Sequence, residues 1–592
     1  MKRIGRRIGV LVICSMILGQ AACAKRDESA RKQEEHDISI ENLTTDITEN
    51  VTKSNAPEGD FVAGGSSGYQ EMRDEPVNPG KAMQSGFTIA LPSKELYHYD
   101  MDLSLNPDTR TVSGHVTFSF YNDSEDVWDK LCLRDYSSHF IDAETAGYNP
   151  NEVTTHGALS SITNLRDSRD GELLRYEREE DASVVFVELK TPLAATEKMT
   201  LSYDFIARIP TVADRYGVSD GIFNVTGFYP MLAEYDAGGW SHRGYINDGE
   251  CFYSEVSDYD VRITVPKGFS VASTGTESCR EESDGTVIYT FAASAVRDFV
   301  FSASERFVKR EEAFDDIRVN LWYNQKMDEE SYWTIPSVGM EDTVKAVMRA
   351  AKDALSAYGE AFGTYPYEEL DIVVSPIETS GMDYPNLIMI SERECMPCME
   401  LVEIRHGEEP DDALSYDRLE TCIAHEIGHQ WFMGIVGNNS GTEPWLDESL
   451  TAYAELVFAE YRMKDAEPDA FCGPLERNSR KTMDMRIADN LRFMNEQGQL
   501  PLNQSYYEFK TDEDYSSAVY VIGQRALYQM EEILGRKAFH GVLREYVRRN
   551  AFANADASKF FEVLYEYAGT TNADLNALID NTFDLRDVET AR

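Results

Sequence analysis

Two histidines four residues apart carry the clearest chemistry in this sequence. Residues 425–429 read His-Glu-Ile-Gly-His, and the surrounding residues 418–431 are compatible with a helix. Side chains four apart lie on one helical face, so both imidazoles can reach a single zinc ion. Glu426 projects to the side of that face, where it can accept a proton from the attacking water. We therefore predict His425 and His429 as metal ligands and Glu426 as the general base.

A third metal ligand is expected on a second helix. Glu448 lies 19 residues after His429, and Pro444 is typical of the first turn of a helix. A helix, a short loop and a second helix can bring Glu448 to the same ion, giving two histidines, one glutamate and an open position. Glu455, two helical turns further on, is predicted to orient one of the histidines. The alternative is that Glu455 is a surface glutamate.

The sequence around these residues resembles the aminopeptidase N family of gluzincin zinc metallopeptidases. The likeness rests on residues 425–432, His-Glu-Ile-Gly-His-Gln-Trp-Phe, and on residues 443–448, Glu-Pro-Trp-Leu-Asp-Glu, at the family's spacing. Residues 99–122 resemble the opening of the family's β domain, and residues 365–367 resemble the entry to its catalytic domain. The resemblance implies one Zn²⁺ per chain and peptide substrates. The helical region ends close to the C-terminus, as expected for a short, two-domain bacterial form with a more open cleft.

The same resemblance implies an oxyanion donor downstream of the glutamate ligand. Residues 515–523 look like the family segment that contains a catalytic tyrosine. Tyr520 matches that tyrosine, and Tyr515 is a nearby auxiliary. A phenol directed at the tetrahedral oxygen would stabilise its developing negative charge.

A further likeness concerns residues 380–384, which read Ser-Gly-Met-Asp-Tyr. They align with the family motif Gly-x-Met-Glu-Asn, whose glutamate binds the free α-amine of the substrate. We therefore predict Gly381, Met382 and Asp383 as substrate-binding residues, with Asp383 bonded to the N-terminal ammonium. Aspartate is one methylene shorter than glutamate, and Met231 stands where the family often has a second amine ligand. Strict exopeptidase action is therefore left open.

These residues together predict metal-assisted hydrolysis of a peptide bond. The expected activity is that of an aminopeptidase, which removes N-terminal residues from extracellular peptides. One alternative is an endopeptidase, or an ester or epoxide hydrolase, on the same zinc site. The other alternative is a non-catalytic surface lipoprotein that binds peptides; the presence of both Glu426 and Tyr520 favours the enzyme.

The secondary structure predicted to position these residues changes along the chain from β-strands to helices. Residues 86–310 show alternating apolar and polar runs separated by turn residues, which predict a β-sandwich or saddle-shaped domain. Residues 311–592 are predicted as a thermolysin-like, mainly helical zinc peptidase domain. Within them we expect a long helix over 341–362, a buried strand over 370–374 and helices from Leu419 onward. The predicted fold class is α+β.

The N-terminal residues predict export. Basic residues within 2–7 precede an apolar run over 8–18 and then small residues, so residues 1–24 are predicted as a signal peptide. Cleavage at an Ala-x-Ala site would release a free secreted protein, whereas a lipoprotein signal would leave Cys23 acylated and the chain held at a bacterial cell surface. Residues 25–85 are polar and acidic, and we predict a disordered tether.

The charge and composition of the chain argue against some classes of binding partner. The net charge of −48 argues against nucleic acid and against electrostatic adhesion to anionic lipid. No second apolar run is long enough to predict a transmembrane helix. Nine cysteines do not form a disulfide framework, and Cys395 and Cys398 are expected as a local disulfide or as two thiols. Oligomeric state is not predicted.

Overall fold

The computed structural model describes residues 87–141, 159–246, 249–250, 252–333, 339–396, 417–463 and 501–584. All of them belong to one compact unit, Pro79–Arg592. The predicted signal peptide, tether and acylated Cys23 lie outside the described residues, as does Cys398. Cys395 is a buried free thiol. Among the helices in the described ranges, none combines the length and the apolar character that a membrane span requires.

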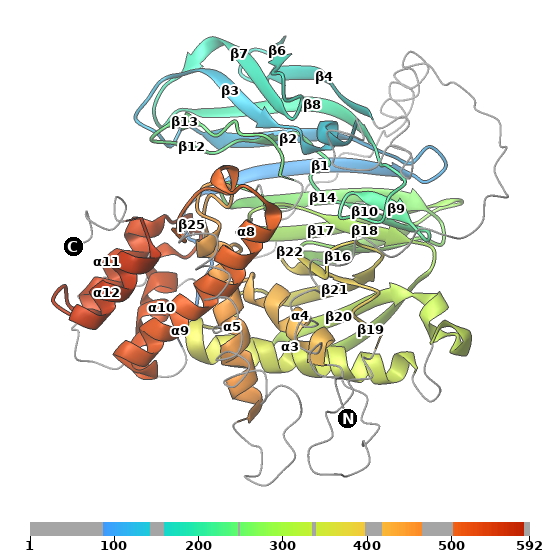
Figure 1. Cartoon of the computed structure of the whole chain (residues 1–592). Coiled ribbons are helices and arrows are strands. Elements are labelled where there is room, and N and C mark those ends of the chain that lie inside the picture. Colours follow the sequence, from blue (N-terminus) through green and yellow to red (C-terminus); the bar gives the residue numbers. More distant parts are fainter. Residues whose placement is uncertain are drawn as a thin grey trace, which may run out of the picture. The chain divides into compact units, whose positions relative to one another are not determined.

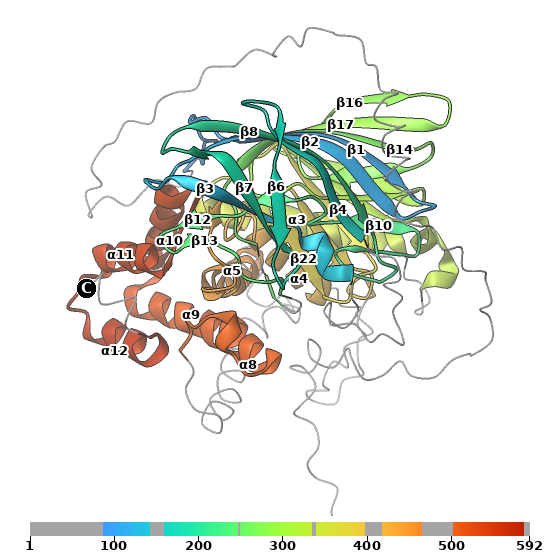
Figure 2. The same cartoon turned by 90° about the horizontal axis from the view of Figure 1, so that it is seen from above.

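A large β-sheet dominates the N-terminal region (Figures 1 and 2). Its described strands follow the order β16-β17-β14-β1-β2-β8-β4-β5, and β1 and β14 form its parallel pair. They are β1 (Tyr97–Asn106), β2 (Thr111–Tyr121), β4 (Leu159–Asp167), β5 (Glu172–Leu173), β8 (Lys198–Arg208), β14 (Ser257–Pro266), β16 (Thr276–Glu282) and β17 (Thr286–Val296). Buried side chains alternate with more exposed ones along β1, because one face of the sheet covers a core.

Two four-stranded sheets share that core. One has the order β15-β18-β10-β9 and the other β11-β3-β7-β6, beside the hairpin β12-β13. The strands are β3 (Trp128–Arg134), β6 (Arg175–Arg178), β7 (Val184–Leu193), β9 (Gly217–Ser219), β10 (Ile222–Val225), β11 (Met231–Leu232), β12 (Tyr235–Asp236), β13 (Gly239–Trp240), β15 (Ser270–Ser273) and β18 (Phe301–Ser304). Tyr99 of the large sheet, Leu133 of β3 and Phe223 of β10 lie in the same apolar cluster. This packing of sheet on sheet agrees with the predicted β-sandwich.

A five-stranded sheet begins the second region. Its order is β19-β20-β21-β23-β22, so β22 lies at an edge and pairs antiparallel with β23. The strands are β19 (Phe307–Phe314), β20 (Ile317–Asn324), β21 (Glu369–Ser375), β22 (Gly381–Tyr384) and β23 (Leu387–Ser391). β21 is buried throughout and includes the predicted strand 370–374. The sheet starts at Phe307, so the predicted boundary at residue 310 falls inside β19. Strands lie on both sides of this point, and the sequence therefore shows no change of pattern there.

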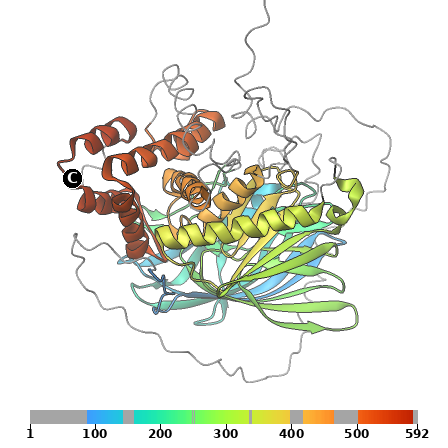
Figure 3. The same ribbon diagram turned by 90° about the horizontal axis from the view of Figure 1, so that it is seen from below.

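Helices complete the second region: α3 lies across this sheet, and the C-terminal helices lie to one side of it (Figure 3). They are α3 (Met340–Phe362), α4 (Asp417–Gly428), α5 (Trp445–Met463), α8 (Asp512–Ser516), the π-helix η7 (Ser517–Ile522), α9 (Gly523–Leu534), α10 (Arg536–Asn550), α11 (Ala557–Ala568) and α12 (Ala573–Thr582). α3 confirms the predicted helix over 341–362 and contacts β20, α4 and α5. One apolar cluster runs through the sheet and these helices, so the orientation of α4 and α5 is set by a continuous core.

A buried arginine connects the two regions. Arg297 directly follows β17 and is 2% exposed. Its guanidinium donates to the carbonyl of Gly434 at 3.1 Å, the carbonyl of Ala553 at 2.9 Å and the side chain of Asn554 at 2.7 Å. Because these partners belong to the helical region, Arg297 joins the β domain to the loop after α4 and to the short strand β25 (Ala553–Asn554).

The first residue of α5 offers a test of this packing. Trp445 is fully buried. Its ring is perpendicular to that of Phe560 at 5.2 Å and is inclined by 68° to that of Phe583 at 5.1 Å. We predict that Trp445→Ala lowers the free energy of unfolding by about 3–5 kcal/mol and the midpoint of thermal unfolding with it. Leu173→Ala, at a residue 52% exposed, is the control and should change stability by less than about 0.5 kcal/mol. Equal midpoints for the two variants would contradict the prediction.

Candidate active site

Three ligand atoms from α4 and α5 converge on one point. His425 Nε2 and His429 Nε2 are 3.1 Å apart, and Glu448 Oε2 lies 3.3 Å from each of them. Two atoms bound to a tetrahedral zinc at about 2 Å lie about 3.3 Å from each other. Among the described residues, Glu448 Oε2 is buried without a hydrogen-bond partner. The spacing and the unpartnered oxygen both fit a shared cation, so the predicted ligands are brought together.

Carboxylates hold the opposite nitrogen of each imidazole. His425 Nδ1 lies 2.8 Å from Glu455 Oε1, and His429 Nδ1 lies 2.8 Å from Asp447 Oδ1. An Nδ1–H that donates to a carboxylate fixes the ring and leaves the lone pair on Nε2. The two Nε2 atoms face each other too closely for both to carry a proton. Each imidazole therefore presents its lone pair to the point shared with Glu448.

The local electrostatics favour positive charge at this point. Burial would lower the pKa of His425, but the carboxylates of Glu448 and Glu455 raise it to about 10. Burial would raise the pKa of Glu448, but the neighbouring imidazoles hold it well below its usual value. The buried carboxylates thus attract cationic charge, which a divalent metal supplies.

Asp447 is a candidate site residue that was not predicted from the sequence. Besides His429, its carboxylate accepts a hydrogen bond from Ser440 Oγ at 2.9 Å, which fixes its orientation. Glu455 was predicted to orient one of the two histidines, and the structure places it on His425. The available signal for Asp447 was its position directly before Glu448 at the start of the same helix.

A glycine lets the two ligand helices approach. Gly428 ends α4, and a Cβ placed there would lie 3.0 Å from Thr451 Cγ2 on α5. Thr451 Oγ1 in turn lies 3.2 Å from His429 Nδ1. Close contact at this position therefore sets the separation of the helices and, through it, the separation of the ligand atoms.

Glu426 lies beside the metal ligands and against the edge strand β22. Its side chain is buried, and burial raises its pKa to about 8, against the lowering effect of both imidazoles. A Cβ on Gly381 would lie 2.2 Å from Glu426 Oε1, so only glycine leaves room for this carboxylate. Gly381 thus shapes the site through Glu426, a role that the sequence alignment did not indicate.

Asp383, Glu426 and His429 form a second group whose ligand atoms lie close together. In this group a single imidazole meets two carboxylates, and one of them is the predicted base. The group of His425, His429 and Glu448 is the better metal site, because both of its imidazoles are oriented by carboxylates. Asp383 and Glu426 then remain available on the substrate side of that site.

Two tyrosines from the segment after residue 511 face the ligands. Tyr520 lies on the π-helix η7, and its ring centroid is 6.0 Å from that of His425. Tyr515 is buried, with its ring perpendicular to that of Tyr520 at 6.2 Å. Burial and the nearby Glu448 raise the pKa of Tyr520 well above its usual value, so the phenol keeps its proton and can donate it in a hydrogen bond.

Asp383 lines a pocket that reaches from His429 into the β domain. His429, Tyr384, Glu250 and Met231 line the same pocket. Burial raises the pKa of Asp383 to about 6, although the charge on His429 lowers it. The pocket therefore offers a carboxylate beside the metal site, where the sequence predicts that the substrate's amine binds.

Met382 was predicted to bind substrate but lies outside the pocket, whereas Glu250 was not predicted and lines it. Met382 alternates with Asp383 along β22 and packs in an apolar cluster, where its sulfur lies 3.6 Å from Arg215 Nη1. It supports the strand and is not among the residues that line the pocket. Glu250 does line the pocket, buried and paired with Arg215 at 3.1 Å. No motif surrounds Glu250, so sequence analysis could not have found it.

Known proteins match the same regions. The family model described as "Peptidase family M1 domain" matches residues 346–582. Aminopeptidase M1-D of Oryza sativa subsp. japonica is 23% identical over 239 residues, which are 39% of this chain and 25% of that protein. Leucine aminopeptidase 2 of Saccharomyces cerevisiae (strain ATCC 204508 / S288c) is 27% identical over 231 residues, 38% of this chain and 30% of that protein. The matching region thus spans less than a third of the length of either relative.

Solved structures share the fold over most of the chain. The crystal structure of the M1 zinc metallopeptidase from Deinococcus radiodurans has a TM-score of 0.55 at 17% identity, and the match covers 82% of this chain and 93% of that one. A mutant of the same enzyme, bound to a Tyr-Ser-Ala substrate, matches with a TM-score of 0.55 at 18% identity over 83% and 94% of the two chains. The α+β prediction, a sheet-rich region followed by a helical domain, is confirmed. Residues 346–582 of this chain therefore match the peptidase family M1 domain, and the sequence resembles the aminopeptidase N type of gluzincin.

Proposed function

We propose that this chain is a zinc-dependent aminopeptidase that removes N-terminal residues from peptides. The observation that carries the proposal is the convergence of His425, His429 and Glu448, with the outer nitrogen of each imidazole held by a carboxylate. These three residues would hold the ion. When bound, zinc polarises the scissile carbonyl and lowers the pKa of water at the open position.

Glu426 and Tyr520 perform the proton transfer and the charge stabilisation in this proposal. Glu426 lies beside the ligands without being one of them, so its carboxylate accepts the proton of the attacking water and passes it to the leaving nitrogen. Tyr520 keeps its proton and donates a hydrogen bond to the carbonyl oxygen as negative charge develops there. Both side chains reach the site from outside the ligand set, as the mechanism requires.

Asp383 determines which bond is cleaved. A buried carboxylate beside the metal site attracts the N-terminal ammonium of a peptide and so places the first peptide bond at the reacting centre. The curated relatives are named as aminopeptidases, and a solved relative holds a Tyr-Ser-Ala substrate, which supports peptides as the substrate class. Hydrolysis of internal peptide bonds, or of esters or epoxides, is the alternative on the same zinc site.

The place of action is a separate proposal. The basic residues and the apolar run within residues 1–24 support export to the extracellular space or to the cell surface. Cys23 would carry the lipid in the anchored form.

Replacement of the base should separate metal binding from catalysis. Glu426→Gln keeps the shape of the side chain but cannot accept the proton, so we expect normal zinc content and a fall in kcat of about 10²–10⁴-fold. Zinc content is measured by elemental analysis and turnover with a panel of aminoacyl fluorogenic substrates. Glu513→Gln, at an exposed position on α8, is the control and should behave as wild type. Substantial turnover by Glu426→Gln would refute the assignment.

Zinc retention should distinguish a metal ligand from a residue that orients a ligand. Glu448→Ala removes a ligand and should abolish zinc retention during dialysis against a chelator. Asp447→Asn leaves the ligands in place but weakens the orientation of His429, so we expect zinc affinity to fall by about 10–100-fold. Full zinc occupancy in Glu448→Ala would remove Glu448 from the ligand set, and unchanged affinity in Asp447→Asn would deny Asp447 an orienting role.

Blocking the substrate's amine tests the exopeptidase assignment. Acetylation removes the positive charge that Asp383 attracts, so N-acetylated peptides should be cleaved far more slowly than free ones. In Asp383→Asn, kcat/KM for the free peptide should fall towards the value for the blocked peptide. A wild-type preference for N-acetylated peptides would instead indicate an endopeptidase.

A further inference from the structure

The pocket beside Asp383 is placed to receive the first side chain of a bound peptide. This inference rests on the proposed function, in which Asp383 holds the substrate's ammonium and the metal site holds the scissile carbonyl. The first side chain leaves from the carbon that joins those two groups. Asp383 and His429 both line the pocket that extends into the β domain. The first side chain therefore lies at the mouth of this pocket.

The wall of this pocket is largely apolar. Its lining includes three aromatic rings and two thioethers, those of Tyr136, Phe252, Tyr384, Met231 and Met433. The ring of Phe252 is nearly perpendicular to that of Tyr136 at 5.9 Å and is inclined by 65° to that of Tyr384 at 5.8 Å. A side chain that enters is stabilised in proportion to the apolar area that it removes from water. The wall thus favours a large apolar side chain.

Three charged groups of the lining already have partners. Glu250 accepts a hydrogen bond from Arg215 at 3.1 Å. Arg297 donates to backbone carbonyls, and the guanidinium of Arg134 lies 4.9 Å from the ring centroid of Tyr136. A charged first side chain would meet charges of both signs here and would lose its hydration. An uncharged side chain avoids that cost.

Asp298 is the lining residue that would favour a cation. Its Oδ1 accepts from the hydroxyl of Tyr229 at 2.8 Å and from the N–H of Phe299 at 2.7 Å, whereas its Oδ2 has no partner among the described residues. Burial raises the pKa of Asp298 to about 7, so its charge is partial near neutral pH. The guanidiniums of Arg134 and Arg297 line the same pocket and oppose a cation. A lysine-like side chain is therefore the competitor that an experiment must include.

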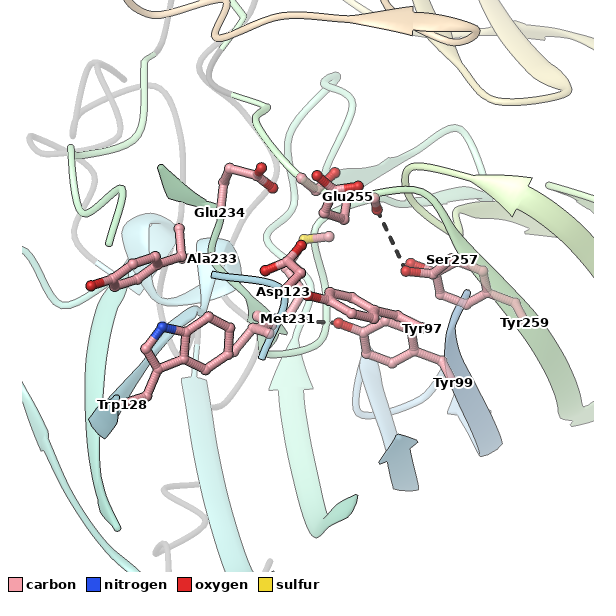
Figure 4. Close-up of a pocket in the computed structure, with 13 residues that line it drawn as sticks. Tyr97, Tyr99, Asp123, Trp128, Met231, Ala233, Glu234, Glu255, Ser257 and Tyr259 are labelled. Atoms are coloured by element: carbon pink, nitrogen blue, oxygen red, sulfur yellow. Dashed lines mark hydrogen bonds between the residues drawn. The ribbon is translucent and has the colours of Figure 1, made fainter. Parts of the chain in front are cut away.

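Met231 separates this pocket from an adjoining pocket of the β domain, since Met231 and Ser254 line both. Ser254 is fixed, because its hydroxyl donates to the carbonyl of Arg297 at 2.9 Å and its own carbonyl accepts from that guanidinium at 2.7 Å. The backbone of Met231 is paired with Arg134, but its unbranched thioether can adapt its shape. Figure 4 shows Met231 beside rings that line the adjoining pocket, those of Tyr97, Tyr99 and Trp128.

We propose that the pocket beside Asp383 selects a large, uncharged first side chain and that Met231 sets the size that it accepts. A shorter residue at position 231 would join the two pockets and leave room for a longer side chain. A bulkier residue would shorten the pocket that the substrate enters.

The test is calorimetric titration of the zinc-loaded full chain with L-amino alcohols, which keep the ammonium and the side chain but have no bond to hydrolyse. L-Phenylalaninol should bind at least about tenfold more tightly than L-alaninol, because it buries more apolar surface. The ratio of the affinity for L-tryptophanol to that for L-alaninol should rise at least about fivefold in Met231→Ala and fall by a similar factor in Met231→Phe. Met348→Ala removes a buried methionine from α3, outside the pocket, and should keep the wild-type ratio.

Met231→Phe keeps the position filled, so the size limit is measured even where Met231→Ala does not fold. Three results would overturn the proposal: no binding of any amino alcohol, tighter binding of L-lysinol than of L-phenylalaninol, or one affinity ratio shared by wild type and both Met231 variants. Hydrolysis of free peptides judges the proposed function separately. Hydrolysis with an unchanged ratio would retain the peptidase and reject the role of Met231, whereas the expected ratios without hydrolysis would retain that role and reject the peptidase.

Discussion

The site depends on two hydrogen bonds between imidazoles and carboxylates. Glu455 and Asp447, both on α5, fix the outer nitrogens of His425 and His429. The inner nitrogens are then directed at one point, where a third residue of α5, Glu448, presents its oxygen. One helix thus supplies a ligand and both orienting groups, and the other supplies both imidazoles. The geometry of the metal site is therefore the geometry of a single helix pair, and the core around α3 holds that pair in place.

The β domain contributes to the same site. It supplies Glu250 and Met231 to the pocket that reaches His429, and it supplies Arg215, which holds Glu250 and contacts Met382 beneath the edge strand. The substrate side of the site is consequently built from both regions of the chain, whereas the metal side is built from the helical region alone. The residues around the metal ligands follow the family pattern closely, whereas the segment that contains Asp383 departs from it.

Much of the metal side could be predicted from the sequence, since it depends on helical spacing: residues four or seven apart share a face whatever the rest of the fold does. Asp447 was missed because adjacent helical residues point in different directions, and only the position of the neighbouring helix shows which one faces His429. Glu250 was missed because its role arises from a contact between distant segments, which leaves no local pattern. The domain boundary near residue 310 was imprecise for a similar reason, since one β-strand follows another there.

The guanidinium of Arg297 has a consequence for how this protein can be divided. Its donors satisfy backbone carbonyls in two separate segments of the helical region, the loop directly after α4 and the strand β25. A helical fragment produced alone would leave those carbonyls without their donor and would expose the apolar surface beside them. The two regions therefore cannot be exchanged independently of each other. A chimaera that takes one region from a relative should keep this arginine together with the segments that it joins.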